Sequence, residues 1–239
     1  VTGTAYAMLV TYASPRAAAQ VKSAVLLAGF EAPGQTTLVE PTPTRDHTER
    51  MLRGFGAEVS TAETDQGLAI TLTGQPTLKA TPVVVPGDPS SAAFLAVAGS
   101  IVPGSALLIE NVMQNGHRTG VFQSLIDMGA DLSLQNQRDV AGETVADVAV
   151  SASSLTGCLI PAERAPSQID EYPILSVAAA VAQGTTRMEG LEELRVKESD
   201  RLQGIIDMLT AAGVTTRSGE DWLEIDGMGG SVPGGGEVL

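Results

Sequence analysis

The amino-acid sequence predicts an α/β protein made of three repeats of one unit, with buried helices and sheets outside them. One plan recurs three times: an alanine-rich segment, a glycine turn, a short strand-like segment and an amphipathic segment. Matching glycines, Gly34, Gly104 and Gly184, mark the turns. Their spacing is too long for a solenoid repeat of roughly 20–50 residues and suits a small βαβ-type unit. Only 3% of the residues are aromatic, so small aliphatic side chains must fill the core.

Each repeat contains two helices of different character. The first is apolar nearly all round, which is typical of a helix buried on every side. The second has its apolar side chains on one face and ends near a glycine, the usual C-terminal stop. The elements of each repeat are given in the order helix, strand, helix and closing strand. In the first repeat we expect them at 17–29, 36–40, 45–56 and 68–72, and in the second at 90–98, 106–110, 118–129 and 147–150. In the third we expect them at 170–182, 185–189, 197–213 and 222–225. The proline-rich segment 75–89 is the expected crossing point between domains.

Composition excludes several classes of function. The chain has 239 residues with 28 acidic and 14 basic side chains, a net charge of −14, which disfavours binding to nucleic acid or to anionic membranes. No apolar run reaches the roughly 18 residues of a membrane span. The single Cys158 can form no internal disulfide, and no Cys/His cluster has the spacing of a zinc site. We therefore expect a globular, cytoplasmic protein without a metal.

Cations stand at two predicted helix starts, where they oppose the helix dipole. Arg45 begins the second helix of the first repeat, and Lys197 and Arg201 lie four residues apart at the start of the corresponding helix of the third. The plain interpretation is a capped or solvated helix start. An anionic ligand such as a phosphate ester would instead offset both the dipole and the mutual repulsion. Glu198, between the two cations, can be ionised or protonated, depending on its burial.

Asp170 begins the buried helix of the third repeat. An acidic residue at such a position is ordinarily a cap. Because the following helix is apolar throughout, the carboxylate can be partly desolvated and act as a general base. The segment 86–91 predicts a turn and an N-cap, and it lacks the Gly-Lys-Ser/Thr core of a P-loop. Together these helix starts suggest a site for small phosphorylated molecules.

Five strings carry a resemblance to a known family. They are QVKS at 20–23, TRDHTE at 44–49, PGDPSS at 86–91, IDEYP at 169–173 and LRVKESDR at 194–201. From about residue 14 to its C-terminus, the chain closely resembles the 5-enolpyruvylshikimate-3-phosphate synthases (3-phosphoshikimate 1-carboxyvinyltransferases), particularly the bacterial glyphosate-tolerant class. The last two strings are highly specific, whereas PGDPSS alone is not.

The resemblance implies an inside-out fold and a truncation. Family members have two domains, each of three βαβαββ units with buried helices and outer sheets. This chain would hold about three of the six units, with 1–82 as the last unit of the first domain and 83–239 as the first two units of the second. Since the chain begins with Val1 and ends in a glycine-rich stretch, truncation at both ends is expected.

The resemblance also implies a reaction. The enolpyruvyl group of phosphoenolpyruvate moves onto the 5-hydroxyl of shikimate 3-phosphate, and phosphate is released, without a metal or other cofactor. The implied partners are these two small molecules, with no nucleic acid and no membrane. Family members are monomeric, and an incomplete chain exposes apolar surface through which it can self-associate.

Three residues would carry the chemistry by resemblance. Asp170 would take the proton of the 5-hydroxyl and hold the shikimate ring, Glu198 would handle the proton at the phosphoenolpyruvate methylene, and Lys197 would bind the shikimate phosphate and assist proton transfer. The two carboxylates could exchange these roles. The implied substrate-binding residues are Ala19, Gln20, Thr44, Arg45, Asp170, Lys197 and Arg201. Of these, Gln20 would contact both substrates, Arg45 would face the shikimate phosphate, and Arg201 would bind phosphoenolpyruvate.

The chain departs from the family pattern in several places. Ala18 stands where the family usually has a serine, so one phosphate contact is lost. The family's lysine-bearing phosphate loop and a phosphoenolpyruvate-binding arginine lie upstream of Val1, and its Asp-His-Arg string and a late lysine lie beyond Leu239. The isolated chain is therefore expected to be inactive or very weakly active.

Two alternative functions remain open from the sequence. One is the related transfer of enolpyruvyl to UDP-N-acetylglucosamine. Its characteristic reactive cysteine loop is not seen, and Cys158 lies in an unrelated context. The other is a non-catalytic α/β fragment that needs a complementary half.

Overall fold

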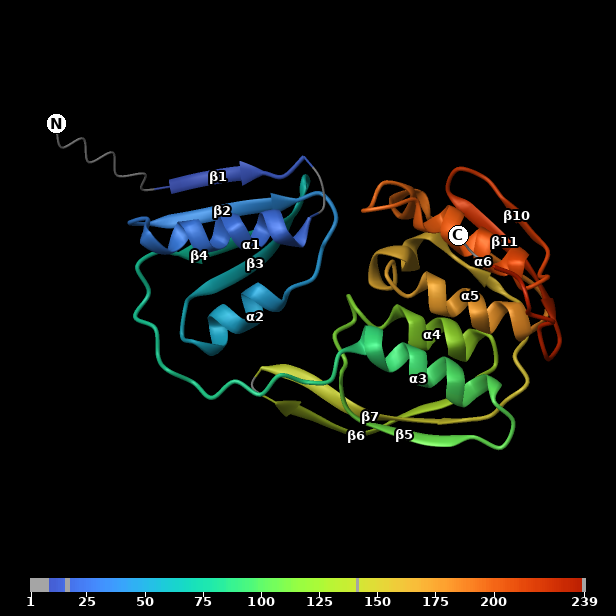
Figure 1. Ribbon diagram of the computed structural model, residues 1–239. Helices are drawn as coiled ribbons and strands as arrows, with labels where there is room; N and C mark the ends of the chain where they lie inside the picture. Colours follow the sequence, from blue (N-terminus) through green and yellow to red (C-terminus); the bar gives the residue numbers. More distant parts are fainter. Residues whose placement is uncertain (1–8, 16–17, 141, 238–239) are drawn as a thin grey trace. The chain divides into compact units, whose positions relative to one another are not determined.

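The chain forms two compact units. The computed structural model describes residues 9–15, 18–140 and 142–237 (Figure 1). Contacts divide the chain into Val1–Val84 and Val85–Leu239, and each unit has its own hydrophobic core. None of the helices in the described ranges combines the length and the apolar character needed to cross a membrane.

The first unit is a four-stranded sheet with two helices. Its elements are β1 (Leu9–Ala13), α1 (Ala19–Ala28), the short 3₁₀ helix η1 (Gly29–Glu31), β2 (Gln35–Glu40), α2 (His47–Gly54), β3 (Val59–Thr64) and β4 (Gly67–Thr73). The strand order is β1-β2-β4-β3, with β1 parallel and β4 antiparallel to β2. Leu26 of α1 and Leu52 of α2 share one core with Leu38 and Ile70 of the sheet, so both helices cover the same face.

The second unit contains two further repeats. The first of them comprises α3 (Pro89–Ile101), β5 (Ala106–Met113), α4 (Gly120–Asp127), β6 (Asp131–Val140) and β7 (Glu143–Ser151). The next comprises β8 (Leu159–Ile160), η2 (Ala162–Ser167), α5 (Tyr172–Val181), β9 (Gln183–Glu189), η3 (Glu192–Arg195), α6 (Arg201–Ala211), β10 (Thr216–Ser218) and β11 (Trp222–Met228). Helix α3 packs on β5 and β7, α5 packs on β11, and α3 and α5 pack on each other. The helices therefore lie between the two sheets (Figure 1), which confirms the predicted α/β class with buried helices and outer sheets.

The sheets also show that the three repeats share one topology. The order β1-β2-β4-β3 recurs as β8-β9-β11-β10. In the middle sheet, β5-β7-β6, a parallel bridge between Gly87 and Val112 stands in the place of the first strand. As predicted, the second helix of each repeat is followed by a glycine in the left-handed region, with φ of 91° at Gly56, 90° at Gly129 and 82° at Gly213.

Five of the six predicted helix starts were too early. Helices α1, α2, α4, α5 and α6 begin at Ala19, His47, Gly120, Tyr172 and Arg201, not at residues 17, 45, 118, 170 and 197. At α6 the reason is the N-cap: the Asp200 carboxylate accepts a hydrogen bond from the backbone N–H of Gln203 at 2.9 Å, and this cap ends the preceding bend. Arg45, Asp170 and Lys197 consequently lie in the segments that lead into helices.

The prediction that every alanine-rich helix is buried on all sides was wrong for two of them. Every residue of α5 is buried or half-buried. In α3, however, Phe94 is 58% exposed and Leu95 52%, and Leu27 of α1 is 56% exposed. The physical reason is that each helix can bury only the faces that meet a sheet or another helix, and the first unit offers α1 a single sheet.

Candidate functional site

An aspartate lies between two cations in the second unit. Lys197 Nζ is 2.7 Å and Arg201 Nη1 is 3.1 Å from the same oxygen, Oδ1, of Asp170. All three side chains are partly buried, with exposed fractions of 29% for Asp170, 17% for Lys197 and 30% for Arg201. Partial burial weakens screening by water, so these ion pairs are stronger than fully exposed ones.

Local structure brings this cluster together. Asp170 lies just before α5, Lys197 lies in the bend between η3 and α6, and Arg201 is the first residue of α6. Helices α5 and α6 pack on each other, which places their starts within reach. The two cations were predicted as a repulsive pair at one helix start. The Asp170 carboxylate offsets that repulsion, because in the substrate-free structure it forms ion pairs with both Lys197 and Arg201.

Glu198 completes the cluster at the surface. Its side chain is 80% exposed, and its Oε2 lies 2.7 Å from Arg201 Nη2. A hydrogen bond from its own backbone N–H, and then the Arg201 guanidinium, hold the pKa of this carboxyl below its ordinary value. The question left open by the sequence is thereby answered for this state, because Glu198 is ionised at neutral pH.

Sequence reasoning missed a polar chain behind Asp170. The hydroxyl of Ser90 donates to the carboxylate of Glu171, which is 3% exposed. Arg118 Nη2 in turn donates to Ser90 Oγ at 2.8 Å and to Asp88 Oδ1 at 2.9 Å. This chain joins the start of α3 to the residue that follows Asp170. The predicted N-cap is also present, since Asp88 accepts from the backbone N–H of Ser91 at 2.9 Å.

The remaining candidates belong to the first unit. Ala19 and Gln20 are the first two residues of α1, with Gln20 exposed and Ala19 half-buried. Thr44 and Arg45, both half-buried, directly precede Asp46, the N-cap of α2. Ser23 Oγ and Thr48 Oγ1 form a hydrogen bond of 2.7 Å that links the two helices. The structure thus gathers Gln20 and Arg45 at the starts of two linked helices.

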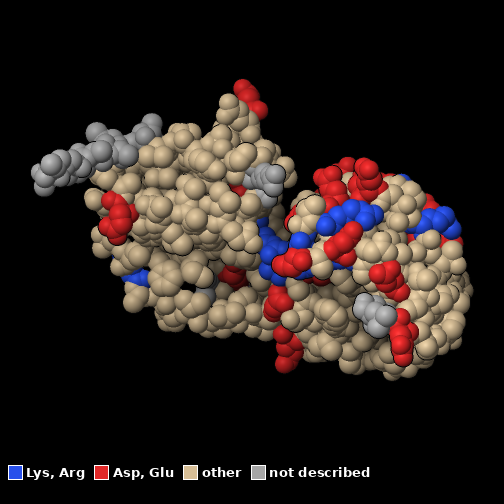
Figure 2. Space-filling view, turned by 45° about the horizontal axis from the view of Figure 1, so that its top comes forward, with Lys and Arg blue, Asp and Glu red and all other residues tan. Residues whose placement is uncertain are grey.

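Positive side chains lie among negative ones on the surface of the second unit. On the face of the second unit that Figure 2 shows, Lys and Arg side chains lie beside Asp and Glu side chains. Over the described part of the chain, no group of three His, Cys, Asp or Glu residues could hold a metal ion.

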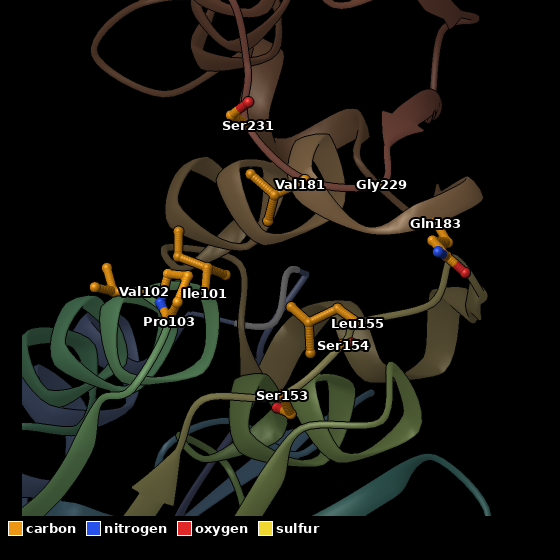
Figure 3. Close-up of a pocket in the computed structure, with 11 residues that line it drawn as sticks. Ile101, Val102, Pro103, Ser153, Ser154, Leu155, Val181, Gln183, Gly229 and Ser231 are labelled. Carbon is orange, nitrogen blue, oxygen red and sulfur yellow. The ribbon is translucent and has the colours of Figure 1, made fainter.

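One pocket of the second unit is separate from these candidates. It has a volume of about 460 Å³ and lies at the C-terminal ends of α3 and α5 (Figure 3). Its lining residues are Ile101, Val102, Pro103, Ser153, Ser154, Leu155, Val181, Gln183, Gly229, Gly230 and Ser231. None of these carries a charge, which does not suit a phosphorylated ligand. Asp170 lies beyond the opposite end of α5, a helix of 10 residues and so about 15 Å long.

Comparison with known proteins identifies the family of this chain. The family model described as EPSP synthase (3-phosphoshikimate 1-carboxyvinyltransferase) matches residues 4–236. A 3-phosphoshikimate 1-carboxyvinyltransferase from Methylobacterium sp. (strain 4-46) is 60% identical over 235 residues, which are 97% of this chain and 52% of the relative.

Solved structures show the same relationship. An EPSP synthase from Acinetobacter baumannii has a TM-score of 0.87 and 46% identity, covering 93% of this chain and 49% of that one. The enolpyruvyl transferase NikO from Streptomyces tendae shares the fold, with a TM-score of 0.61 and 21% identity, covering 85% of this chain and 45% of its own. The chain spans about half the length of the curated relatives it matches. It belongs to the EPSP synthase (3-phosphoshikimate 1-carboxyvinyltransferase) family.

Proposed function

We propose that this chain supplies half of an enzyme that transfers the enolpyruvyl group of phosphoenolpyruvate to the 5-hydroxyl of shikimate 3-phosphate. In the first step the hydroxyl oxygen bonds to C2 of phosphoenolpyruvate, the hydroxyl loses its proton, and the methylene carbon gains one. In the second step the resulting methyl group loses a proton, the bond from C2 to the phosphate oxygen breaks, and phosphate leaves. The observation that carries the proposal is Asp170 held between Lys197 and Arg201 in a chain of this family.

Asp170 is the proposed base for the 5-hydroxyl. In the substrate-free state both cations contact its Oδ1, so this oxygen is not available to the 5-hydroxyl. The anionic groups of the two substrates would compete for Lys197 and Arg201, because phosphate and carboxylate are strong partners for ammonium and guanidinium groups. Substrate binding would thereby release the Asp170 carboxylate for the reaction.

Glu198 is the proposed donor and acceptor of the methylene proton. Arg201 helps to keep its pKa low in the free chain. When Arg201 turns to phosphoenolpyruvate, that stabilisation is lost and the pKa of Glu198 rises, which favours protonation. Because the Glu198 carboxyl is exposed, it can take this proton from water before bound substrate shields it from solvent.

The first unit would bind the shikimate phosphate. Arg45 supplies the positive charge, Gln20 contacts both substrates, and Ala19 and Thr44 border the same site. In this proposal, 1–82 is the last unit of one enolpyruvyl transferase domain, and 83–239 are the first two units of the other. A monomeric, cytoplasmic protein would catalyse the reaction. The isolated chain would be inactive or very weakly active.

A chimaera tests the proposed function. This chain replaces the segment that it matches in the Methylobacterium relative, so that a full-length protein results. We expect phosphate release that depends on both shikimate 3-phosphate and phosphoenolpyruvate, with a carboxyvinyl product seen by mass spectrometry. With UDP-N-acetylglucosamine as the acceptor, no product is expected. A folded chimaera without transfer to shikimate 3-phosphate would contradict the proposal and favour a non-catalytic fragment.

A further inference from the structure

A lysine and two glutamates lie buried together in the first unit. Lys22 of α1 is 1% exposed, while Glu40 at the end of β2 and Glu49 of α2 are 0% and 2% exposed. Lys22 Nζ lies 3.1 Å from Glu40 Oε2 and 2.9 Å from Glu49 Oε1. These three residues form the buried charge cluster. Buried ion pairs generally add little stability compared with apolar residues of similar volume, so stability alone does not account for them.

The buried charge cluster holds one residue, Thr44, at three polar atoms. Lys22 Nζ donates to the Thr44 carbonyl oxygen at 3.4 Å. Glu40 accepts from the Thr44 hydroxyl at 2.5 Å and from its backbone N–H at 3.4 Å. Both the backbone and the side chain of Thr44 are therefore fixed. The next residue in the chain is Arg45.

The same cluster joins α1, which carries Gln20, to α2, which Arg45 precedes. Lys22 lies two positions after Gln20 in α1, and its pairing with Glu49 attaches this helix to α2. Glu49 Oε2 is buried and has no hydrogen-bond partner among the described residues. The Lys22 ammonium is therefore the polar contact that the structure gives the Glu49 carboxylate, and together with the Ser23–Thr48 hydrogen bond it links the two helix starts.

We infer that Lys22, Glu40 and Glu49 are positioning residues, which hold Arg45 and Gln20 in the geometry that binds the phosphate of shikimate 3-phosphate. Holding Arg45 in place before the ligand arrives lowers the entropic cost of binding. The identity of the ligand rests on the proposed function. The fixation of Thr44 does not, and it can be measured without substrate.

The test uses a triple variant, Lys22→Met with Glu40→Leu and Glu49→Leu. It removes all three charges at similar volume, whereas Lys22→Met alone leaves two carboxyl groups buried without their cation. Thr44→Val is a milder second variant, because it removes only the hydroxyl contact. Lys79→Met is the matched control, since Lys79 is an exposed lysine of the same unit. Far-UV circular dichroism establishes that each variant is folded.

The first measurement is amide hydrogen exchange in the 239-residue chain, followed by NMR. In the triple variant the amides of Thr44 and Arg45 should exchange about tenfold faster or more, while Ile70 in β4 keeps its wild-type rate. Thr44→Val should give a smaller increase, and Lys79→Met none. Wild-type exchange at Thr44 and Arg45 in both the triple and the Thr44→Val variants would overturn the inference.

The second measurement is steady-state kinetics of the chimaera. The KM for shikimate 3-phosphate should rise about tenfold or more in the triple variant, with a smaller change in kcat, because a binding group is displaced and the reacting groups are not. An unchanged KM in an active chimaera would also overturn the inference. If the wild-type chimaera is inactive, the proposed function fails, and the exchange measurement alone decides whether the cluster positions Arg45.

Discussion

At the scale of single residues, the contact between Ser90 and Glu171 supports the position of Asp170. Glu171 is almost fully buried, and Ser90 donates to its carboxylate. Ser90→Ala removes this donor from a buried charged group, which should destabilise the second unit by about 1–3 kcal/mol. Guanidinium unfolding followed by the fluorescence of Trp222 measures the change.

The neighbouring serine provides a control for this prediction. Ser91 is exposed, and both its hydroxyl and its backbone N–H donate to Asp88 Oδ2 at 2.9 Å. The backbone bond keeps the cap after the side chain is shortened. Ser91→Ala should therefore change the stability by no more than about 0.5 kcal/mol. Equal effects of the two substitutions would contradict the role given to Ser90.

Tyr172 makes the stability of the second unit depend on alkaline pH. Its side chain is fully buried, and burial raises its pKa from 10.0 to about 12. The unfolded chain loses this proton first, so the stabilisation is complete below pH 10 and is lost as the pH rises towards 12. We expect Tyr172→Phe to flatten this alkaline decline, as measured by chemical unfolding between pH 9 and about 12. Parallel curves for wild type and variant would contradict this.

The residues of the site were more predictable from the sequence than the hydrogen bonds that connect them. Lys197, Glu198 and Arg201 stand in one short string, so their common location followed from the sequence. The polar chain behind Asp170 could not be found in this way, because Glu171 is 81 residues from Ser90, and Ser90 is 28 residues from Arg118. The packing of α3 on α5 brings Ser90 to Glu171, and Arg118 reaches Ser90 from the segment between β5 and α4.

At the scale of elements, local pattern and local capping had different predictive value. Amphipathic spacing with terminal glycines located α2, α4 and α6, and alanine-rich apolar segments located α1, α3 and α5, because these signals lie within each segment. The start of α6 was misplaced because it depends on which side chain caps the backbone, as Asp200 does, whereas Glu171, the N-cap residue of α5, makes no side-chain cap hydrogen bond. Two irregular strand positions, Asn111 and Asn136, were not predicted either.

These two asparagines depend on one aspartate of the middle strand. Asn111 and Asn136 have positive φ angles of 59° and 50°, and they lie where the pairing of β5 and β6 with β7 shifts register. Asp147 of β7 accepts from the Asn111 backbone N–H at 2.8 Å and from Asn136 Nδ2 at 2.9 Å. The Asp147 carboxylate therefore stabilises the register shift in β5 on one side of β7 and the register shift in β6 on the other.

This arrangement predicts a dependence on acidic pH. The hydrogen bond from the Asn111 backbone N–H, and then that from Asn136, lower the pKa of Asp147 below 3.8. The stabilisation is present above the ordinary value and is lost as the pH falls through the lowered one. Between pH 5 and about 2, wild type should therefore lose stability more steeply than Asp147→Asn in urea unfolding. An equal or steeper loss in the variant would contradict this role.

At the scale of the whole molecule, two separate cores predict two unfolding transitions. The smaller core belongs to the first unit and the larger to the second. Trp222 is the only tryptophan and lies in the second unit, with the Arg187 guanidinium 4.4 Å from its ring centre. Its fluorescence should follow one transition, while far-UV circular dichroism should follow both. Coincident single transitions by the two probes would instead show that the units unfold together.

The proposed enzyme depends most directly on Asp170 as the base. In the chimaera, the measurement is the rate of enolpyruvyl transfer by wild type, by Asp170→Asn and by Asp207→Asn, an exposed aspartate of α6. Asp170→Asn should lower kcat by about 10²-fold or more, with binding of shikimate 3-phosphate still measurable by calorimetry, and Asp207→Asn should leave kcat unchanged. Transfer by Asp170→Asn at the wild-type rate would contradict the account.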